Sequence, residues 1–143
     1  MAPTSDNQDD ILITDSITRL DAPQGKVIVA ASHGAIYAAY LAAKAQARAV
    51  ILNDASVGRD GAGISGLAYL AGFGLPAATI AHDSARIGDG ADMIARGRIS
   101  HANASAGALG VIAWSPRGPG MPTHLWPTRL TRSATRPAAR AMR

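Results

Sequence analysis

Reactive and hydrogen-bonding side chains recur at three places where a short apolar segment ends. They form three groups along the chain: Ser32, His33 and Gly34 after residues 26–31; Asn53 and Asp54 after residues 49–52; His82, Ser84 and Arg86 after residues 77–81. Hydroxyl, imidazole and carboxylate groups perform nucleophilic and acid/base catalysis, and arginine binds carboxylates and phosphates. The three groups therefore indicate a site for a small polar or anionic ligand.

The group around Ser32 has the strongest pattern. Ala30-Ala31-Ser32-His33-Gly34 resembles the nucleophile elbow of α/β-hydrolases, with alanine at the first glycine position. Asp54 and His82 then complete the chain order of serine, acid and base, which makes Ser32, His33, Asp54 and His82 the candidate catalytic residues. Only one short apolar segment precedes this motif, so we favour a Ser32 that caps the following helix and binds an anion there. A cap without any ligand is the third interpretation.

The neighbouring polar residues each have a functional and a structural interpretation. His33 is a candidate general base or a turn residue that faces solvent. Asn53 and Asp54 hydrogen-bond either a ligand or the backbone of their own loop, since unpaired polar groups after a buried strand are costly. Arg86 either holds an anionic substrate or pairs with a nearby aspartate.

Residues 57–63 form a glycine-rich loop that carries Asp60, a further candidate for binding substrate. The spacing Gly61-x-Gly63-x-x-Gly66 matches a dinucleotide fingerprint, but the preceding apolar segment ends nine residues earlier, so we predict no cofactor. His82 and the aspartates at 83, 89 and 92 follow no known spacing of metal ligands, and we predict no metal.

The segments that position these groups alternate between strand and helix patterns. Apolar runs at 11–13, 26–31, 49–52 and 77–81 predict short buried strands. Helices are predicted over 35–47, 63–73, 89–96 and 100–109. The pattern predicts an α/β three-layer sandwich with a short, mostly parallel sheet, of the Rossmann-like or flavodoxin-like class. In such a sheet the three polar groups meet at the carboxyl edge.

The charge of the chain is distributed unevenly. Residues 1–111 hold ten aspartates and eight basic residues, a net charge of −2, whereas residues 112–143 hold six arginines and no acid. The chain divides into a polar extension (1–10), an α/β domain (11–111) and a proline- and arginine-rich tail (112–143), which we expect to be disordered. A tail from a shifted reading frame is the favoured interpretation; a basic arm that binds nucleic acid and an extension without a role are the others.

The leading functional hypothesis is a small anionic metabolite bound at the carboxyl edge, with hydrolase- or lyase-type acid/base chemistry if the protein is an enzyme. Ser32 or His33 would act directly, Asp54 would orient or deprotonate, and Arg86 would hold the substrate. The alternatives are a non-catalytic regulatory domain with the same site, and nucleic-acid binding through the tail. Without cysteine, a secretory signal or a long apolar run, the chain is expected to be cytoplasmic, without a membrane partner. An exposed edge of the sheet makes a homo-oligomer a further expectation.

Overall fold

A computed structural model describes residues 10–114 and 126–133 of the chain. In chain order the elements are β1 (Ile11–Thr14), β2 (Val27–His33), α2 (Ile36–Lys44), β3 (Ala49–Asn53), the 3₁₀ segment η1 (Arg59–Ile64), α3 (Ser65–Ala71), β4 (Ala77–Ile80), α4 (Gly90–Arg96), β5 (Ile99–Ala102), α5 (Ala104–Ala108) and α6 (Trp126–Ser133). The four strands expected from apolar runs are present, with ends that differ by at most two residues.

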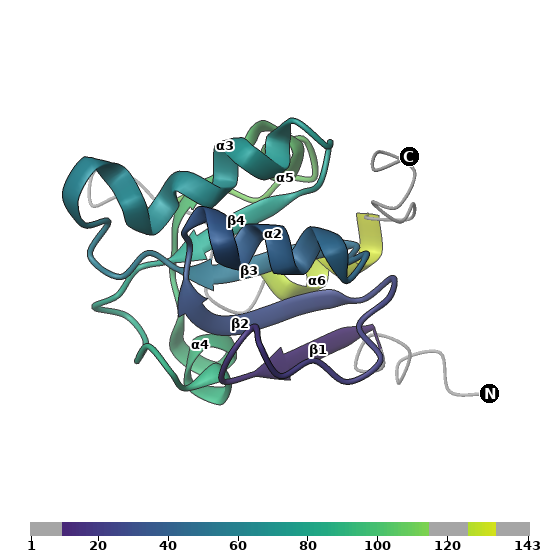
Figure 1. Cartoon of the computed structure of the whole chain (residues 1–143), viewed down its shortest axis with the longest axis horizontal. Coiled ribbons are helices and arrows are strands. Elements are labelled where there is room, and N and C mark those ends of the chain that lie inside the picture. Colours follow the sequence, from purple (N-terminus) through teal and green to yellow (C-terminus); the bar gives the residue numbers. More distant parts are fainter. Residues whose placement is uncertain (1–9, 115–125, 134–143) are drawn as a thin grey trace.

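The strands form one sheet in the order β1-β2-β3-β4-β5. Strands β1 to β4 are parallel, and their carboxyl ends point to the left in Figure 1. The α/β class with a mostly parallel sheet is thus confirmed. The strand order is consecutive, whereas the Rossmann and flavodoxin orders reverse direction within the sheet.

The fifth strand corrects one predicted element. Residues 100–109 were expected to form a single helix, but β5 occupies residues 99–102 and pairs antiparallel with β4. The helix begins only at Ala104, where the Asn103 side chain accepts a hydrogen bond from the Ala106 N–H. A hydrogen bond of 2.9 Å between the Thr79 and Ser100 hydroxyls joins the two strands, a contact between residues 21 positions apart that local periodicity does not reveal.

Two hydrophobic clusters cover the two faces of the sheet. The first cluster includes alternate β2 residues, such as Ile28 and Ala30, with the inner sides of α2 and α3. The second includes Val27, Val29 and Ala31 with residues of α4 and α6. In Figure 1, α2 lies in front of the sheet and the yellow α6 lies behind it. This alternation decides on which face each residue at the end of β2 emerges.

Helix α6 falls within the predicted tail. Trp126 and Leu130 are fully buried in the second cluster, and the Trp126 Nε1–H donates to the Gly97 carbonyl at 3.1 Å. Disorder was expected of the tail because proline interrupts its periodicity, but residues 126–133 form this helix. The other segments of the tail, 115–125 and 134–143, lie outside the described residues, as do residues 1–9. None of the described helices has the length and apolar character needed to cross a membrane.

Candidate functional site

The carboxyl edge of the sheet opens between β3 and β4. The chain leaving β3 leads to α3 on the first face, whereas the chain leaving β4 leads to α4, which packs against β1 and β2 on the second face. Adjacent loops that depart to opposite faces leave a crevice between them, the position where ligands bind in open α/β sheets. Asp54 is the first residue after β3. His82 is the second residue after β4, following Ala81.

The Asp54 carboxylate fixes the His82 imidazole in this crevice. Asp54 Oδ1 accepts hydrogen bonds from the Ser56 N–H (3.0 Å) and the His82 N–H (3.0 Å), and lies 3.2 Å from His82 Nδ1. The Asp54 side chain is 5% exposed and the His82 side chain 50% exposed. A buried carboxylate therefore holds one ring nitrogen while half of the imidazole surface remains accessible. Two of the predicted catalytic residues are in direct contact.

A first cleft lies on the side of His82 that faces β2. We call it the His33 cleft; it has a volume of about 380 Å³ and is lined by His33, Asn53, Ala55, Ser56, His82 and Ile87. A register shift in β2 sets His33 opposite Asn53, the last residue of β3. Asn53 is fully buried, accepts from the Ala55 N–H at 2.8 Å and donates to the Ala85 carbonyl at 3.4 Å. Its amide therefore braces the loops, as the structural interpretation of Asn53 expects.

A second cleft lies on the side of His82 that faces β5. We call it the Arg98 cleft; it has a volume of about 290 Å³ and is lined by Asp54, Ala81, His82, Asp83, Arg98, Ile99, Ser100 and Trp114. The Arg98 guanidinium carbon lies 4.5 Å from the centre of the Trp114 ring. His82 lines both clefts, so its half-exposed imidazole lies between them.

Ser32 belongs to neither of these clefts. It lies within β2 on the face of Ile28 and Ala30, and its hydroxyl accepts a hydrogen bond of 2.9 Å from the Ile17 N–H. The capping interpretation is wrong, because Ala35 is the N-cap of α2 and no side chain caps this helix. The resemblance to a nucleophile elbow does not extend to the geometry either: Ser32 is part of the strand and is not among the described residues with positive φ.

Gly34 and the glycine-rich segment have a packing role. A Cβ at Gly34 would meet the Gly63 carbonyl oxygen and lie 2.8 Å from the Thr79 methyl, and one at Gly63 would meet the Asp54 carbonyl oxygen. Gly66 lies against Ala39 of α2, and its N–H donates to the Gly34 carbonyl at 2.8 Å. The glycine spacing that matches a dinucleotide fingerprint thus serves close approach between segments of this chain.

The remaining predicted residues, Ser84, Asp60 and Arg86, line neither the His33 cleft nor the Arg98 cleft. Ser84 is nearly buried, and its hydroxyl is used twice: it donates to the Ala81 carbonyl (2.8 Å) and accepts from the Arg98 N–H (2.9 Å). Asp60 is exposed in η1 with a φ of 58°, and lines neither the His33 cleft nor the Arg98 cleft. Arg86 is exposed and also lines neither of them.

The acidic residues near Arg86, Asp89 and Asp92, accept hydrogen bonds from groups in and beside α4. Asp92 accepts two hydrogen bonds from the Arg96 guanidinium, at 2.8 and 2.9 Å, and one of 2.9 Å from the Arg86 N–H. The hydrogen bonds from the Arg96 guanidinium and the Arg86 N–H lower the pKa of Asp92 to about 2. The hydrogen bond between Asp92 and Arg96 also raises the pKa of Arg96. Asp89 caps the helix by accepting from the Asp92 N–H at 3.0 Å. Across residues 10–114 and 126–133, no group of three or more acidic or histidine side chains is arranged to hold a metal ion.

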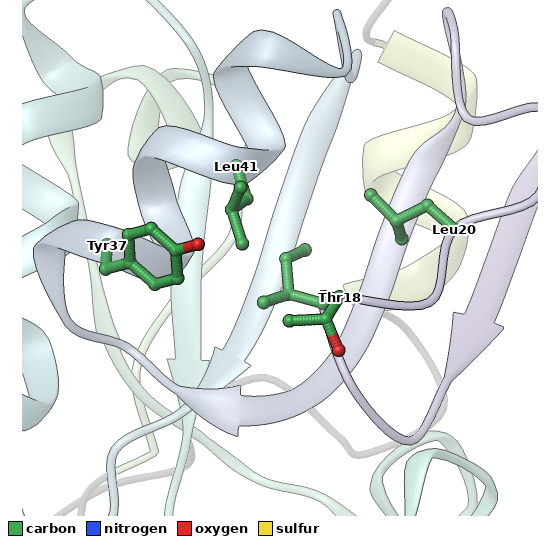
Figure 2. Close-up of a pocket in the computed structure, with 5 residues that line it drawn as sticks. Thr18, Leu20, Tyr37 and Leu41 are labelled. Carbon is green, nitrogen blue, oxygen red and sulfur yellow. The ribbon is translucent and has the colours of Figure 1, made fainter.

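A third cleft, of about 360 Å³, lies on the first face between α2 and the connection from β1 to β2. Figure 2 shows Tyr37 and Leu41 of α2 facing Thr18 and Leu20 across it. Ile17, whose N–H binds the Ser32 hydroxyl, completes the lining. This cleft has no acidic, basic or imidazole side chain in its lining, so it lacks the chemistry of the carboxyl-edge crevice.

Several residues that line the two clefts were not predicted from the sequence, and Ser56, Arg98 and Trp114 are among them. Ser56 is exposed in a loop where Ala55, Ser56 and Val57 all have positive φ, between 50° and 68°. A run of non-glycine residues in this conformation is energetically costly and characteristic of functional loops. Arg98 and Trp114 come from segments predicted to be a helix boundary and a tail, and only the strand β5 brings them beside His82. Two aspects of the sequence, the loop position of Ser56 and the Trp-Ser-Pro break after Ala113, were available as weak signals.

Comparison of the chain with family models, with curated proteins and with solved structures gave no match.

Proposed function

We propose that the chain binds a small, anionic metabolite at the carboxyl edge of the sheet, and that His82 exchanges a proton with it. The observation that carries this proposal is the Asp54–His82 pair, in which a buried carboxylate holds a half-exposed imidazole between two clefts. An imidazole held by a carboxylate at one ring nitrogen can accept and return a proton at the other nitrogen during a reaction.

The pair supports a definite direction of proton transfer. When His82 Nδ1 carries the proton, it donates to Asp54 Oδ1, and the lone pair of Nε2 is available to take a proton from the ligand or from a water molecule. The carboxylate then stabilises the imidazolium that forms. Proton abstraction of this kind serves both hydrolase- and lyase-type chemistry.

The position of Ser32 favours direct acid/base chemistry over an acyl-enzyme. Its hydroxyl lies on the first face of the sheet and is bound to the Ile17 N–H, whereas His82 lines clefts that do not include Ser32. A base activates a nucleophile only within hydrogen-bond reach, directly or through one water molecule. We therefore assign the base to His82 and give Ser32 no chemical step.

Hydrolysis of a p-nitrophenyl ester that carries a free carboxylate, such as mono-p-nitrophenyl glutarate, tests the proton-transfer assignment. We expect His82→Gln to lower the rate by about 100-fold, the smaller end of the range for a positioned base, and Asp54→Asn to lower it less. His101→Gln, which removes a histidine outside both clefts, and Ser32→Ala are the matched controls and should retain the wild-type rate. Equal rates for the wild type and His82→Gln would contradict the catalytic assignment and favour the non-catalytic binding domain.

A further inference from the structure

We propose that Arg98, whose guanidinium lies over the Trp114 ring, is the residue that binds the anionic group of the ligand. The inference rests on the proposed function and deepens it: the ligand is a small organic carboxylate or phosphate whose charge lies at Arg98 and whose reacting part lies at His82. Arg98 takes the role that sequence reasoning gave to Arg86.

The location of Arg98 is the first argument. Arg98 and His82 line the same cleft, and the Asp54 carboxylate that holds the imidazole lies in its wall. The volume of about 290 Å³ is at the small end of ligand sites, which restricts the ligand to a compact molecule. A ligand that bridges Arg98 and His82 would fill this cleft.

The second argument is that the guanidinium is held in place by the protein. Its carbon lies over the Trp114 ring, 4.5 Å from the ring centre, which is within the range of a cation–π contact. Both backbones are also secured, since the Arg98 N–H donates to Ser84 Oγ at 2.9 Å and the Trp114 N–H donates to the Ile99 carbonyl at 2.8 Å. A guanidinium that an aromatic ring and a secured backbone hold in position is suited to bidentate recognition of a carboxylate or phosphate.

The third argument is that the charge of Arg98 is only loosely matched within the described part of the chain. Its one ion pair there joins Nη2 to Asp83 Oδ1 at 3.5 Å, longer than the 2.7–2.9 Å of charge-assisted hydrogen bonds. The Asp83 side chain is 65% exposed, and solvent weakens such a pair. Arg98 Nε is buried and donates to no acceptor among the described residues. To bind Arg98, a ligand anion therefore has to displace one exposed carboxylate, that of Asp83.

Titration with malonate and with inorganic phosphate, each at constant ionic strength in sodium chloride, tests this role. Binding is followed by the shift in Tm and by the imidazole resonances of the histidines. We expect Arg98→Gln to weaken binding by at least about tenfold. Arg86→Gln, which removes an exposed arginine outside the cleft, should bind as the wild type does. Malonamide, which has no charge, should not bind. The anion that binds more tightly identifies the carboxylate or the phosphate as the natural group.

A second variant guards against a fold defect in Arg98→Gln. Asp83→Asn removes the competing carboxylate at an exposed position, so it should tighten anion binding roughly twofold to fivefold. Wild-type affinity in Arg98→Gln, or weaker binding in Asp83→Asn, would overturn the proposal. Binding that depends on Arg98 but leaves the His82 resonance unmoved would support the anion site and overturn the proposed function. The absence of binding to the wild type would overturn both.

Discussion

Helix α2 covers the first face of the sheet through alanines, whereas α6 covers the second face through a tryptophan and a leucine. The buried side of α2 consists of alanines, and Gly66 of α3 lies directly against Ala39. On the second face, Met93 of α4 and Trp126 and Leu130 of α6 are fully buried. The contact between α2 and α3 on the first face depends on close backbone approach, whereas α6 fills the second face with large side chains.

The two faces also differ in how their helices begin. No side chain caps α2 or α3, but Asp89 caps α4 and Asn103 caps α5. His82 and the clefts beside it lie where the chain passes from α3 on the first face, through β4, to α4 on the second face. The chemistry of the site therefore depends on the face of the sheet to which each loop leads, as well as on the residue types in the loop.

The largest effect is expected from emptying the second face. Trp126→Ala removes a fully buried indole and its hydrogen bond to the Gly97 carbonyl, which should lower the free energy of unfolding by roughly 3–5 kcal/mol. Urea unfolding measures this change. Trp126→Phe, which keeps most of the volume, should cost clearly less. A neutral Trp126→Ala would show that side-chain volume does not hold this face.

An intermediate effect is expected from separating the helices of the first face. Gly66→Ala places a methyl group 2.7 Å from the Ala39 Cβ and 2.8 Å from the Ala35 carbonyl oxygen, so the unfolding free energy should fall by about 2 kcal/mol. Gly107→Ala in α5 is the matched control: its methyl would meet no atom within 4 Å, and alanine should stabilise that helix by roughly 0.5–1 kcal/mol. Equal behaviour of the two variants in urea unfolding would contradict close packing between α2 and α3.

The smallest effect concerns the start of α4. The Arg96 guanidinium and the Arg86 N–H lower the pKa of Asp92 from 3.8 to about 2. A lowered pKa means that the carboxylate stabilises the folded state above pH 3.8, and that this contribution disappears as the pH falls toward 2. Stability measured against pH should therefore decline less steeply over this interval in Asp92→Asn than in the wild type. A difference that persists unchanged at pH 2 would assign the effect of Asp92 to something other than its charge.

Particular residues show how far the sequence could predict the site. Asn53, Asp54 and His82 were expected to meet because parallel strands bring their carboxyl ends to one edge, and they do line the same crevice. Ser32 and His33 were both expected at this edge, but His33 lines a cleft there and Ser32 does not, since neighbouring strand residues point to opposite faces. The register shift that sets His33 opposite Asn53 depends on pairing between strands, which no local pattern reports.

Arg98 and Trp114 show the other source of error. The residues around Arg98 fit a helix as well as a strand, because a short segment with few apolar residues has no distinct period. Pairing with β4 selects the strand, and the antiparallel direction of β5 carries its first residues back to the carboxyl edge beside His82. Trp114, which follows α5 in the chain, lies beside the first residue of β5 because its N–H donates to the Ile99 carbonyl.

The sequence by itself determined the alternation of strands and helices and the edge at which polar loops gather, since apolar spacing and turn residues act over a few neighbouring positions. The tertiary structure alone decided which side chains share a cleft. It did so because the face on which a residue emerges, the direction of an added strand and the burial of a helix such as α6 depend on partners far away in the chain.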